Sequence, residues 1–175
     1  MEAFNVDLTK YIRDVPNFPK EGIIFKDITP LLKNPEALRY SVELIHRHYA
    51  DAGITGVAGI ESRGFIFGCP IAHAFNVGFI PIRKPGKLPY DTYREEYDLE
   101  YGTDCIEMHT DAAGPGDTIL IIDDLLATGG TAAAARKLIE QTGAKVAGFG
   151  FVIELTFLEG AHKLGNLPVF SLIKY

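Results

Sequence analysis

One stretch of the chain combines carboxylates, glycines and threonines in an order that suits a phosphorylated sugar. The apolar run 118–122 is followed by Asp123 and Asp124, and then by the turn Ala127-Thr128-Gly129-Gly130-Thr131. Such a run predicts a buried strand, and ligands of open α/β sheets bind at the carboxyl ends of strands. Glycines let backbone amides approach an anion, and a helix that starts at the turn adds positive potential. The turn therefore predicts a phosphate site, whereas the two carboxylates suit neighbouring hydroxyls or a hydrated cation.

The same residues have a purely structural interpretation, in which the aspartates end a strand and the glycines form a turn. An isolated Gly-Gly pair would favour that interpretation. The full order of strand, paired acids, Thr-Gly-Gly-Thr and helix favours a ligand site instead. Two other phosphate motifs are excluded, because this stretch has neither the Gly-Lys-Ser/Thr of a nucleotide P-loop nor the Gly-x-Gly-x-x-Gly of a dinucleotide fold.

Basic residues suited to a diphosphate lie in two other loops. Glu61-Ser62-Arg63-Gly64 follows the apolar run 57–60 and forms a second loop at a strand end, where Arg63 offers a fork of donors. Arg83, Lys84 and Lys87 then place three cations within five positions of a chain whose formal charge is -6. The alternatives are a surface arginine that pairs with a nearby acid and a cluster of solvated charge.

Length and composition exclude several classes of protein. With 175 residues, 47% of them hydrophobic, the chain predicts one soluble globular domain over residues 1–175. No apolar run approaches the roughly 20 residues that span a bilayer, and residues 1–10 lack the apolar core of a signal peptide. Two cysteines are too few for a disulfide framework, which predicts a reducing compartment and a cytoplasmic location. The net negative charge disfavours nucleic-acid binding, and the histidines lack metal-ligand spacing.

Apolar periodicity predicts the elements that position these loops. Helices are expected from Pro35, with Asn34 as the N-cap, to Gly53; from Gly64 to Asn76; and from Gly130 to Gly143. Pro70 must either start or kink the second of these helices. Strands are expected at the short apolar runs 57–60, 79–82, 118–122, 146–153 and 169–173. Their alternation with helices is typical of an α/β fold with a central, mostly parallel sheet flanked by helices.

Two segments do not follow that alternation. Residues 83–109 carry Pro85, Gly86 and Pro89 among many polar residues and have no helical period. They predict a long flexible loop or hairpin between two strands, and excursions of this length in a compact domain are usually functional or disordered. Residues 1–33, with their prolines and aromatic residues, predict a small N-terminal hood.

The stretch from Ile119 to Thr131 resembles the phosphoribosyl-diphosphate signature of the type I phosphoribosyltransferase family. Other strings resemble the adenine-specific members of that family and extend the resemblance over almost the full chain. They are Phe18-Pro19, Gly22-Ile23-Ile24-Phe25-Lys26-Asp27-Ile28, Glu61-Ser62-Arg63-Gly64-Phe65, Arg83-Lys84-Pro85-Gly86-Lys87-Leu88-Pro89, Leu99-Glu100-Tyr101-Gly102 and Phe170-Ser171-Leu172-Ile173. The resemblance implies the fold of that family and an enzyme of purine salvage. Such an enzyme transfers the 5-phosphoribosyl group from phosphoribosyl diphosphate to adenine and gives AMP and diphosphate.

The resemblance also implies roles for individual residues. Those expected to bind phosphoribosyl diphosphate are Asp123, Asp124, Ala127, Thr128, Gly129, Gly130, Thr131, Ser62, Arg83, Lys84 and Lys87. Those expected to bind adenine are Ile24, Phe25, Lys26 and Leu125, and those expected in catalysis are Glu100, Tyr101 and Arg63. In this scheme the two aspartates contact the ribose hydroxyls, the turn holds the 5′-phosphate, and the base lies between two apolar side chains. Glu100, in the long excursion 83–109, accepts or relays the base proton.

The resemblance further implies Mg²⁺ carried in with the phosphoribosyl diphosphate, no dedicated protein ligand for the metal, a homodimer, and a cis peptide between Glu61 and Ser62. Neither nucleic acid nor a membrane is expected as a partner. Two alternative functions stay open: transfer to a 6-oxopurine, and a non-catalytic regulator that senses phosphoribosyl diphosphate. Such a regulator would be expected to carry a DNA-binding appendage or a basic face. A receiver-type signalling domain is disfavoured, because its acidic pair would lie near the N-terminus.

Overall fold

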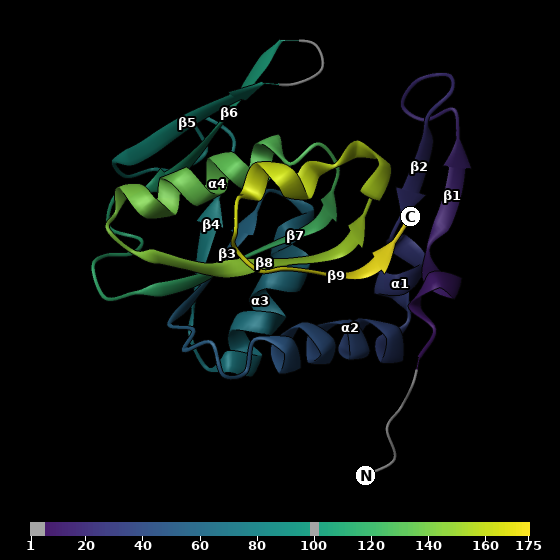
Figure 1. The fold of residues 1–175 in the computed structure, drawn as a ribbon, viewed down its shortest axis with the longest axis horizontal. Helices are drawn as coiled ribbons and strands as arrows, with labels where there is room; N and C mark the ends of the chain where they lie inside the picture. Colours follow the sequence, from purple (N-terminus) through teal and green to yellow (C-terminus); the bar gives the residue numbers. More distant parts are fainter. Residues whose placement is uncertain (1–5, 99–101) are drawn as a thin grey trace.

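The centre of the fold is a sheet whose strands lie in the order β4-β3-β7-β8-β9 (Figure 1). The computed structural model describes residues 6–98 and 102–175 of the chain. The strands of this sheet are β3 (Gly56–Ile60), β4 (Gly78–Ile82), β7 (Thr118–Leu126), β8 (Lys145–Glu154) and β9 (Val169–Lys174). Every neighbouring pair in it is parallel. The predicted α/β fold is therefore confirmed, and each of the five apolar runs lies in one of these strands.

Helices cover both faces of the sheet. Figure 1 shows α4 (Gly130–Gln141) on one side, and α2 (Pro35–His48) and α3 (Arg63–Phe75) on the other. Ile119 and Ile121 of β7 belong to the buried cluster that contains α4, whereas Leu120 and Ile122 belong to the cluster that contains α2 and α3. Successive side chains of a strand point to opposite faces, so one continuous apolar strand supplies both cores. None of the described helices is long and apolar enough to cross a membrane.

The helix signals in the sequence are largely confirmed. The Asn34 side chain accepts a hydrogen bond from the Ala37 N–H at 2.9 Å, as expected of an N-cap residue before a proline. Helix α2 ends at His48, short of the predicted Gly53, with Tyr49 as its C-cap. The Tyr49 hydroxyl donates to the Phe149 carbonyl on β8 at 2.8 Å, which ties the end of this helix to the sheet. Pro70 lies inside α3 and does not start it.

Strand β7 is longer than its apolar run predicts. It continues from Ile122 through Asp123 and Asp124 to Leu126, because its backbone pairing with β8 persists. The predicted bounds 118–122 are therefore too short, whereas the aspartates do lie at the carboxyl end of the strand, within its last residues. A hydrophobic pattern cannot reveal this extension, because the ladder depends on backbone groups and not on side-chain polarity.

The excursion 83–109 contains an antiparallel hairpin, which the sequence allowed as one of two outcomes. Strands β5 (Thr92–Asp98) and β6 (Thr103–His109) pair from Thr92↔His109 to Asp98↔Thr103. Ile106 and Met108 of β6 are buried in the core beside α4. An antiparallel bridge between Arg83 and Glu107 joins the base of the hairpin to the end of β4. This segment is therefore packed onto the body of the protein over much of its length.

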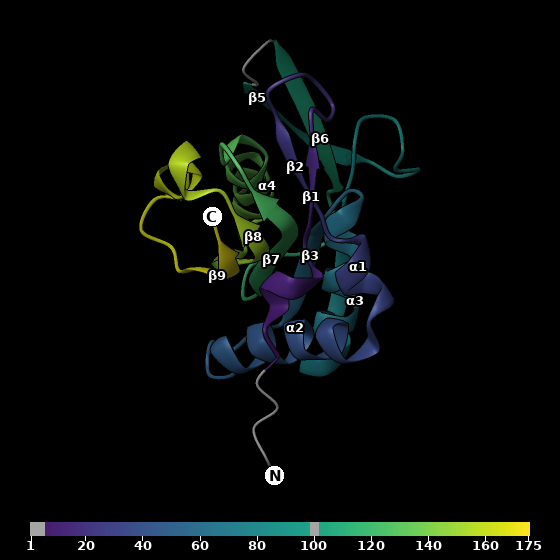
Figure 2. The ribbon, with the colours of Figure 1, turned by 90° about the vertical axis from the view of Figure 1, so that its right-hand side faces the viewer.

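The N-terminal segment forms a second antiparallel hairpin beside the carboxyl end of the sheet. Strands β1 (Arg13–Pro16) and β2 (Ile24–Asp27) follow the 3-10 helix η1 (Leu8–Tyr11) and precede the short helix α1 (Thr29–Lys33). Figures 1 and 2 show this hairpin and the hairpin β5–β6 both rising above the sheet. The Lys26 ammonium lies 3.8 Å from the ring centroid of Tyr175, just after β9. The predicted hood thus contacts the far edge of the sheet.

Tyr49→Phe tests the tie between α2 and the sheet. Burial raises the pKa of Tyr49 to about 12, and its hydroxyl donates to the carbonyls of Phe149 at 2.8 Å and Pro168 at 3.2 Å. We expect the variant to lower the free energy of unfolding by about 1–3 kcal/mol, because a buried carbonyl loses its donor. Urea denaturation measures this difference.

Tyr40→Phe is the matched control on the same helix. Tyr40 is half-buried, and its hydroxyl makes no hydrogen bond within residues 6–98 and 102–175. The control should change the free energy of unfolding by less than about 0.5 kcal/mol. An equal loss in both variants would contradict the role given to the Tyr49 hydroxyl.

Candidate functional site

The loop after β3 and the end of β7 meet in one pocket. Glu61, Ser62 and Arg63 from the loop and Asp123 and Asp124 from the strand line it. Pairing between β3 and β7 stops at Gly59↔Ile122, whereas β7 continues to pair with β8. Beyond Ile122, β7 thus has no strand neighbour on the side of β3, and the loop occupies that space. The two predicted strand-end loops are therefore adjacent, as a parallel sheet requires.

A close backbone approach holds the start of α3 against the acidic residues. A Cβ atom on Gly64 would lie 2.7 Å from the Ile122 carbonyl oxygen and 3.1 Å from Oδ1 of Asp123. No side chain fits there, so glycine is required by contact. The peptide bond between Glu61 and Ser62 is cis, as the family resemblance implies. The glycine contact fixes where Arg63, the first residue of α3, can reach.

Asp124 of the acidic pair is buried and makes an ion pair with Arg63, whereas Asp123 is half-buried. Asp124 is 5% exposed at its side chain, and its Oδ2 lies 2.7 Å from Nε of Arg63. Burial raises the pKa of Asp124, and the Arg63 guanidinium opposes that shift. Burial, and then repulsion from the Asp124 carboxylate, raises the pKa of Asp123 well above its usual value. Both carboxylates are therefore costly to keep charged, and groups that donate hydrogen bonds to them are favoured ligands.

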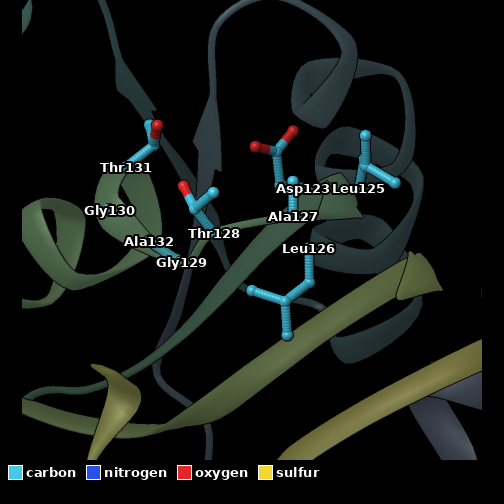
Figure 3. A pocket seen from close by; sticks show the side chains of 9 residues that line it. All are labelled: Asp123, Leu125, Leu126, Ala127, Thr128, Gly129, Gly130, Thr131 and Ala132. Carbon is cyan, nitrogen blue, oxygen red and sulfur yellow. The ribbon is translucent and has the colours of Figure 1, made fainter. Parts of the chain in front are cut away.

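The predicted phosphate turn forms a second pocket next to the first. Asp123 borders both pockets, and the turn pocket is lined as follows: Asp123, Leu125, Leu126, Ala127, Thr128, Gly129, Gly130, Thr131 and Ala132. Figure 3 shows the oxygen atoms of Thr128, Thr131 and Asp123 directed to the same side of the turn. Helix α4 begins at Gly130, and Gly129 adopts a left-handed conformation with φ of 78° as its N-cap. The predicted turn and helix start are thus confirmed. The first amides of a helix have no partner within it, and here they lie beside the hydroxyls of Thr128 and Thr131 in one pocket.

Gly160 supports this turn from a distant part of the chain, and sequence reasoning missed it. It begins the 3-10 helix η3 (Gly160–Leu164), which follows η2 (Thr156–Leu158). A Cβ atom on Gly160 would lie 2.1 Å from the Ala127 carbonyl oxygen and 2.9 Å from the Gly129 nitrogen. Any side chain at position 160 would displace the turn. The local sequence around Gly160 resembles an ordinary turn, so no signal in it indicates this contact.

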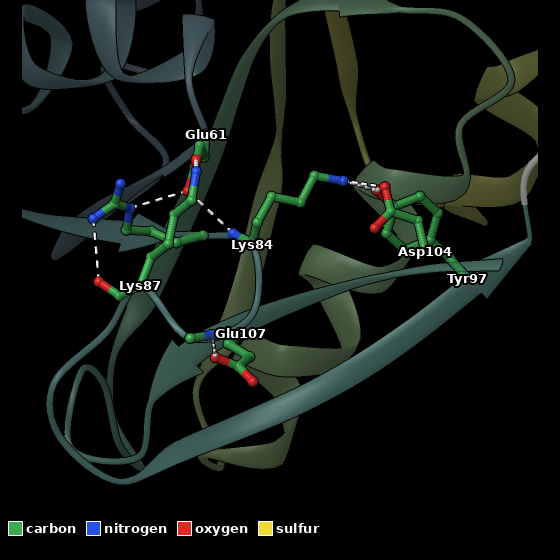
Figure 4. A network of polar contacts seen from close by, with 8 residues as sticks. Glu61, Lys84, Lys87, Tyr97, Asp104 and Glu107 are labelled. Carbon is green, nitrogen blue, oxygen red and sulfur yellow. Dashed lines mark hydrogen bonds and ion pairs between the residues drawn. The ribbon is translucent and has the colours of Figure 1, made fainter.

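The predicted diphosphate cations pair with acids of the same chain. Arg83 Nε lies 3.0 Å from Oε2 of Glu61, and the Lys87 ammonium contacts Oε1 of the same carboxylate (Figure 4). The Lys84 ammonium instead contacts Asp104 on β6, and it also lies 3.0 Å from the Tyr97 hydroxyl on β5. The three cations therefore do not converge on one point. Arg63 pairs with Asp124, which is the alternative that the sequence left open for this arginine. Arg83, Lys84 and Lys87 also pair with acids, which the sequence did not predict.

The residues predicted to bind a purine lie on the hood and on β7. Ile24 is 56% exposed, and the Phe25 ring packs edge-on against Phe18 with a centroid distance of 5.2 Å. The Arg63 guanidinium lies 5.4 Å from the centroid of the Phe25 ring, which brings the hood next to the acidic pair. Leu125 is half-buried and lines the turn pocket.

The side chain of Lys26 is occupied within the protein. Its ammonium lies 2.7 Å from Oδ1 of Asp14 and above the ring of Tyr175. The Lys26 side chain is therefore engaged within the protein, and the predicted contact of Lys26 with a base would have to use its backbone.

Two predicted catalytic residues are not placed. Glu100 and Tyr101 lie outside the described residues, between Asp98 on β5 and Gly102. Within residues 6–98 and 102–175, no group of three or more His, Cys, Asp or Glu residues could hold a metal ion. His48 stacks on Phe170 with a centroid distance of 3.9 Å, and His46 lies 4.5 Å from Phe75, so these two histidines pack against aromatic rings.

Comparison with known proteins matches both the fold and the sequence. A family model described as a phosphoribosyl transferase domain matches residues 27–163. The adenine phosphoribosyltransferase of Thermosynechococcus vestitus is 55% identical over 170 residues, which cover 97% of this chain and 100% of that relative.

Two solved structures have the same architecture. The adenine phosphoribosyltransferase of Thermoanaerobacter pseudethanolicus superposes with a TM-score of 0.93 at 49% identity, covering 96% of this chain and 98% of the other. That of Saccharomyces cerevisiae, solved with adenine and an imino-altritol bisphosphate, superposes with a TM-score of 0.89 at 42% identity. The match covers 94% of this chain and 96% of the other.

Gly160→Ala tests the support of the turn. The added methyl would overlap the Ala127 carbonyl and push the turn away from η3. We expect roughly 10- to 100-fold weaker binding of inorganic phosphate, because displacement of positioned donors by about 1 Å is costly. Amide chemical shifts of Thr128, Gly129 and Gly130 during a phosphate titration measure it.

The matched control is Gly114→Ala, since a Cβ atom there meets nothing within 4 Å. It should bind phosphate as the unmodified chain does. Unweakened binding in Gly160→Ala would show that the turn does not depend on this contact.

Proposed function

The chain belongs to the phosphoribosyltransferase family, and on that premise we propose that it is an enzyme of purine salvage. It transfers the 5-phosphoribosyl group from phosphoribosyl diphosphate to adenine and gives AMP and diphosphate. The main support for this class of reaction is that Asp123 lines both the acidic pocket and the pocket of the predicted phosphate turn. The choice of adenine is carried by relatives named for it, which match almost the whole chain.

In the proposed complex the sugar phosphate spans the two adjacent pockets. The 5′-phosphate accepts hydrogen bonds from the turn amides and from Thr128 and Thr131. The ribose hydroxyls donate to Asp123 and Asp124, whose burial favours such donors. This placement directs C1 of the ribose toward the loop with Ser62 and Arg63, and the diphosphate toward Arg63, Arg83, Lys84 and Lys87. Arg63 then leaves Asp124 and binds phosphate oxygens instead. The hydrogen bonds that Asp124 accepts from the ribose hydroxyls offset the loss of this ion pair.

The reaction breaks the bond from C1 to the diphosphate oxygen and forms a bond from an adenine ring nitrogen to C1. Positive charge develops on the sugar as the leaving group departs, as in glycosidic chemistry in general. The proton of the base leaves through a carboxylate, a role that we assign to Glu100 beside Tyr101 on the basis of the family resemblance. A loop that closes over the site would exclude water, which otherwise hydrolyses the activated sugar.

Adenine is held between the hood and β7. Phe25 and Leu125 cover its two faces, and the main chain of Ile24 and Lys26 accepts from its 6-amino group. The support for Phe25 is its position beside Arg63, which itself pairs with Asp124. A backbone acceptor discriminates against a 6-oxo group, because two lone pairs would face each other.

We also propose a magnesium ion bound to the diphosphate of the substrate, together with a homodimer and a cytoplasmic location. The carboxylate oxygens of Asp123 and Asp124 are the hard donors that Mg²⁺ prefers, and they fit contact with a hydrated ion. The ion would neutralise charge on the diphosphate. The homodimer rests on the family resemblance alone, and the location on the presence of only two cysteines, Cys69 and Cys105, both free thiols.

AMP formation from adenine is the primary test. Purified protein with Mg²⁺ and phosphoribosyl diphosphate should convert adenine in preference to hypoxanthine and guanine, as product analysis measures. Glu100→Ala should lower kcat by roughly 100- to 10,000-fold with little change in the affinity for phosphoribosyl diphosphate, because it removes a proton acceptor. Preference for a 6-oxopurine would contradict the assignment of adenine as the substrate. Binding without turnover would favour a regulator, and an unchanged kcat would remove Glu100 from the mechanism.

The acidic pair should make binding of the sugar phosphate dependent on pH. The pKa of Asp123 is raised, so this carboxyl becomes protonated at less acidic pH than usual and then no longer accepts from a ribose hydroxyl. Affinity for phosphoribosyl diphosphate should therefore rise with pH across the titration of the pair, as calorimetry at several pH values measures.

Asp123→Asn should bind roughly 10-fold more weakly and lose this part of the dependence. Titration of the substrate phosphates is common to both proteins, so the difference between their profiles isolates Asp123. Identical profiles would contradict contact between Asp123 and the ribose.

A further inference from the structure

The carboxylate of Glu61 is surrounded by donors from the loop that follows β4. We call this loop, residues 83–87, the cation loop. Its Oε2 accepts from Arg83 Nε at 3.0 Å and from the Lys84 backbone N–H at 3.1 Å. Its Oε1 contacts the Lys87 ammonium. Figure 4 shows these donors arranged around the one side chain. Glu61 thus binds a guanidinium, an ammonium and an amide from a single loop.

The Glu61 side chain is largely shielded from solvent, and both of its oxygens are engaged. Its side chain is only 10% exposed, and both carboxylate oxygens have partners. Burial alone would raise the pKa of Glu61, but hydrogen bonds from Lys87, the Lys84 amide and Arg83 lower it below the usual value. The group is therefore ionised near neutral pH, and its charge is balanced locally.

The contact leaves donors available on both cations. Arg83 uses Nε for Glu61 and Nη1 for the Lys87 carbonyl at 3.2 Å, and within the described residues its Nη2 has no hydrogen-bond partner. An ammonium has three donors, of which Glu61 engages one on Lys87. The backbone of Arg83 exchanges two hydrogen bonds with Glu107, at 2.9 and 2.7 Å. The root of the cation loop is thus fixed by β6, and its side chains are fixed by Glu61.

Glu61 also belongs to the wall of the acidic pocket, next to Ser62 and Arg63. We propose that Glu61 is a positioning residue for the diphosphate of the substrate. It holds Arg83 and Lys87 at the edge of the site with their remaining donors ready for phosphate oxygens. This inference rests on the proposed function and deepens it, since it explains how cations that carry like charge are kept together before the ligand binds.

The opposite role would be that of an internal competitor, in which the diphosphate displaces Glu61 from its cations. Displacement would leave a nine-tenths buried carboxylate without donors, which is strongly unfavourable. The unused donors of Arg83 and Lys87 make displacement unnecessary. The geometry therefore favours a carboxylate that keeps its partners while the ligand binds.

Glu61→Gln tests the inference in the full-length protein. The amide keeps an oxygen for the Lys84 N–H but loses the charge that orients the two cations. We expect the Kd for inorganic diphosphate in the presence of Mg²⁺, and the KM for phosphoribosyl diphosphate, to rise about tenfold, with kcat changed by less than about twofold. Calorimetry gives the Kd, and initial rates of AMP formation give KM and kcat.

The matched control is Glu107→Gln, because Glu107 accepts from the Gly86 N–H of the same loop at 3.1 Å and contacts no cation within the described residues. Its amide oxygen preserves that contact, so Kd, KM and kcat should stay unchanged. Glu61→Asp keeps the charge with a shorter reach and should give intermediate values of Kd and KM. If Glu61→Gln does not fold, Glu61→Asp provides the test, because Kd and KM equal to those of the unmodified chain would then reject the inference.

Three results would overturn the proposal. Tighter diphosphate binding in Glu61→Gln would establish the competitor role. Unchanged Kd and KM would remove Glu61 from ligand binding, and a fall in kcat at constant KM would indicate a general structural defect. Failure of the proposed function is distinguishable, because the unmodified chain would then bind diphosphate without making AMP from adenine.

Discussion

Beyond Ile122, strand β7 has a hydrogen-bonded neighbour on one side only, and the site depends on this asymmetry. Pairing with β8 keeps β7 extended to Leu126, while β3 has already turned into the loop that carries Glu61 and Arg63. The space released beside β7 holds the acidic pair and its arginine. A sheet whose strands all ended at the same level would leave Asp123 and Asp124 in a loop, without a rigid backbone to position them.

Ion pairs within the chain determine where the cationic side chains of the site lie. Arg63 pairs with Asp124, Arg83 and Lys87 pair with Glu61, and Lys84 pairs with Asp104. A protein with a net charge of -6 thereby keeps its cationic loop beside acidic side chains, and each of these four cations is paired with a carboxylate. In the proposed complex a polyanionic ligand exchanges some of these partners. The ribose hydroxyls then donate to the acidic pair, and Glu61 retains its own partners.

Close backbone contacts position the same groups with little tolerance. Gly64 brings the start of α3 against Asp123, and Gly160 brings η3 against the phosphate turn. Gly64 thus contacts the end of β7 and Gly160 contacts the turn that follows it, so both pockets are bordered by segments whose approach leaves no room for a side chain. The hood adds a third constraint, since Lys26 connects β2 to Asp14 and to Tyr175 at the edge of the sheet.

The sequence by itself determined the α/β class, the cores of the strands, the N-cap of α2 and the glycine-rich turn at the start of α4. These features follow from local signals, namely apolar periodicity, capping residues and glycines that permit a left-handed turn. Only the tertiary structure decided the extension of β7 to Leu126, the support of the turn by Gly160, and the pairing of each cation with its acid. Each of these joins segments far apart in the chain, such as Glu61 with Lys87 or Arg63 with Asp124. No local pattern contains that information, because it depends on which strands become neighbours and where their pairing ends.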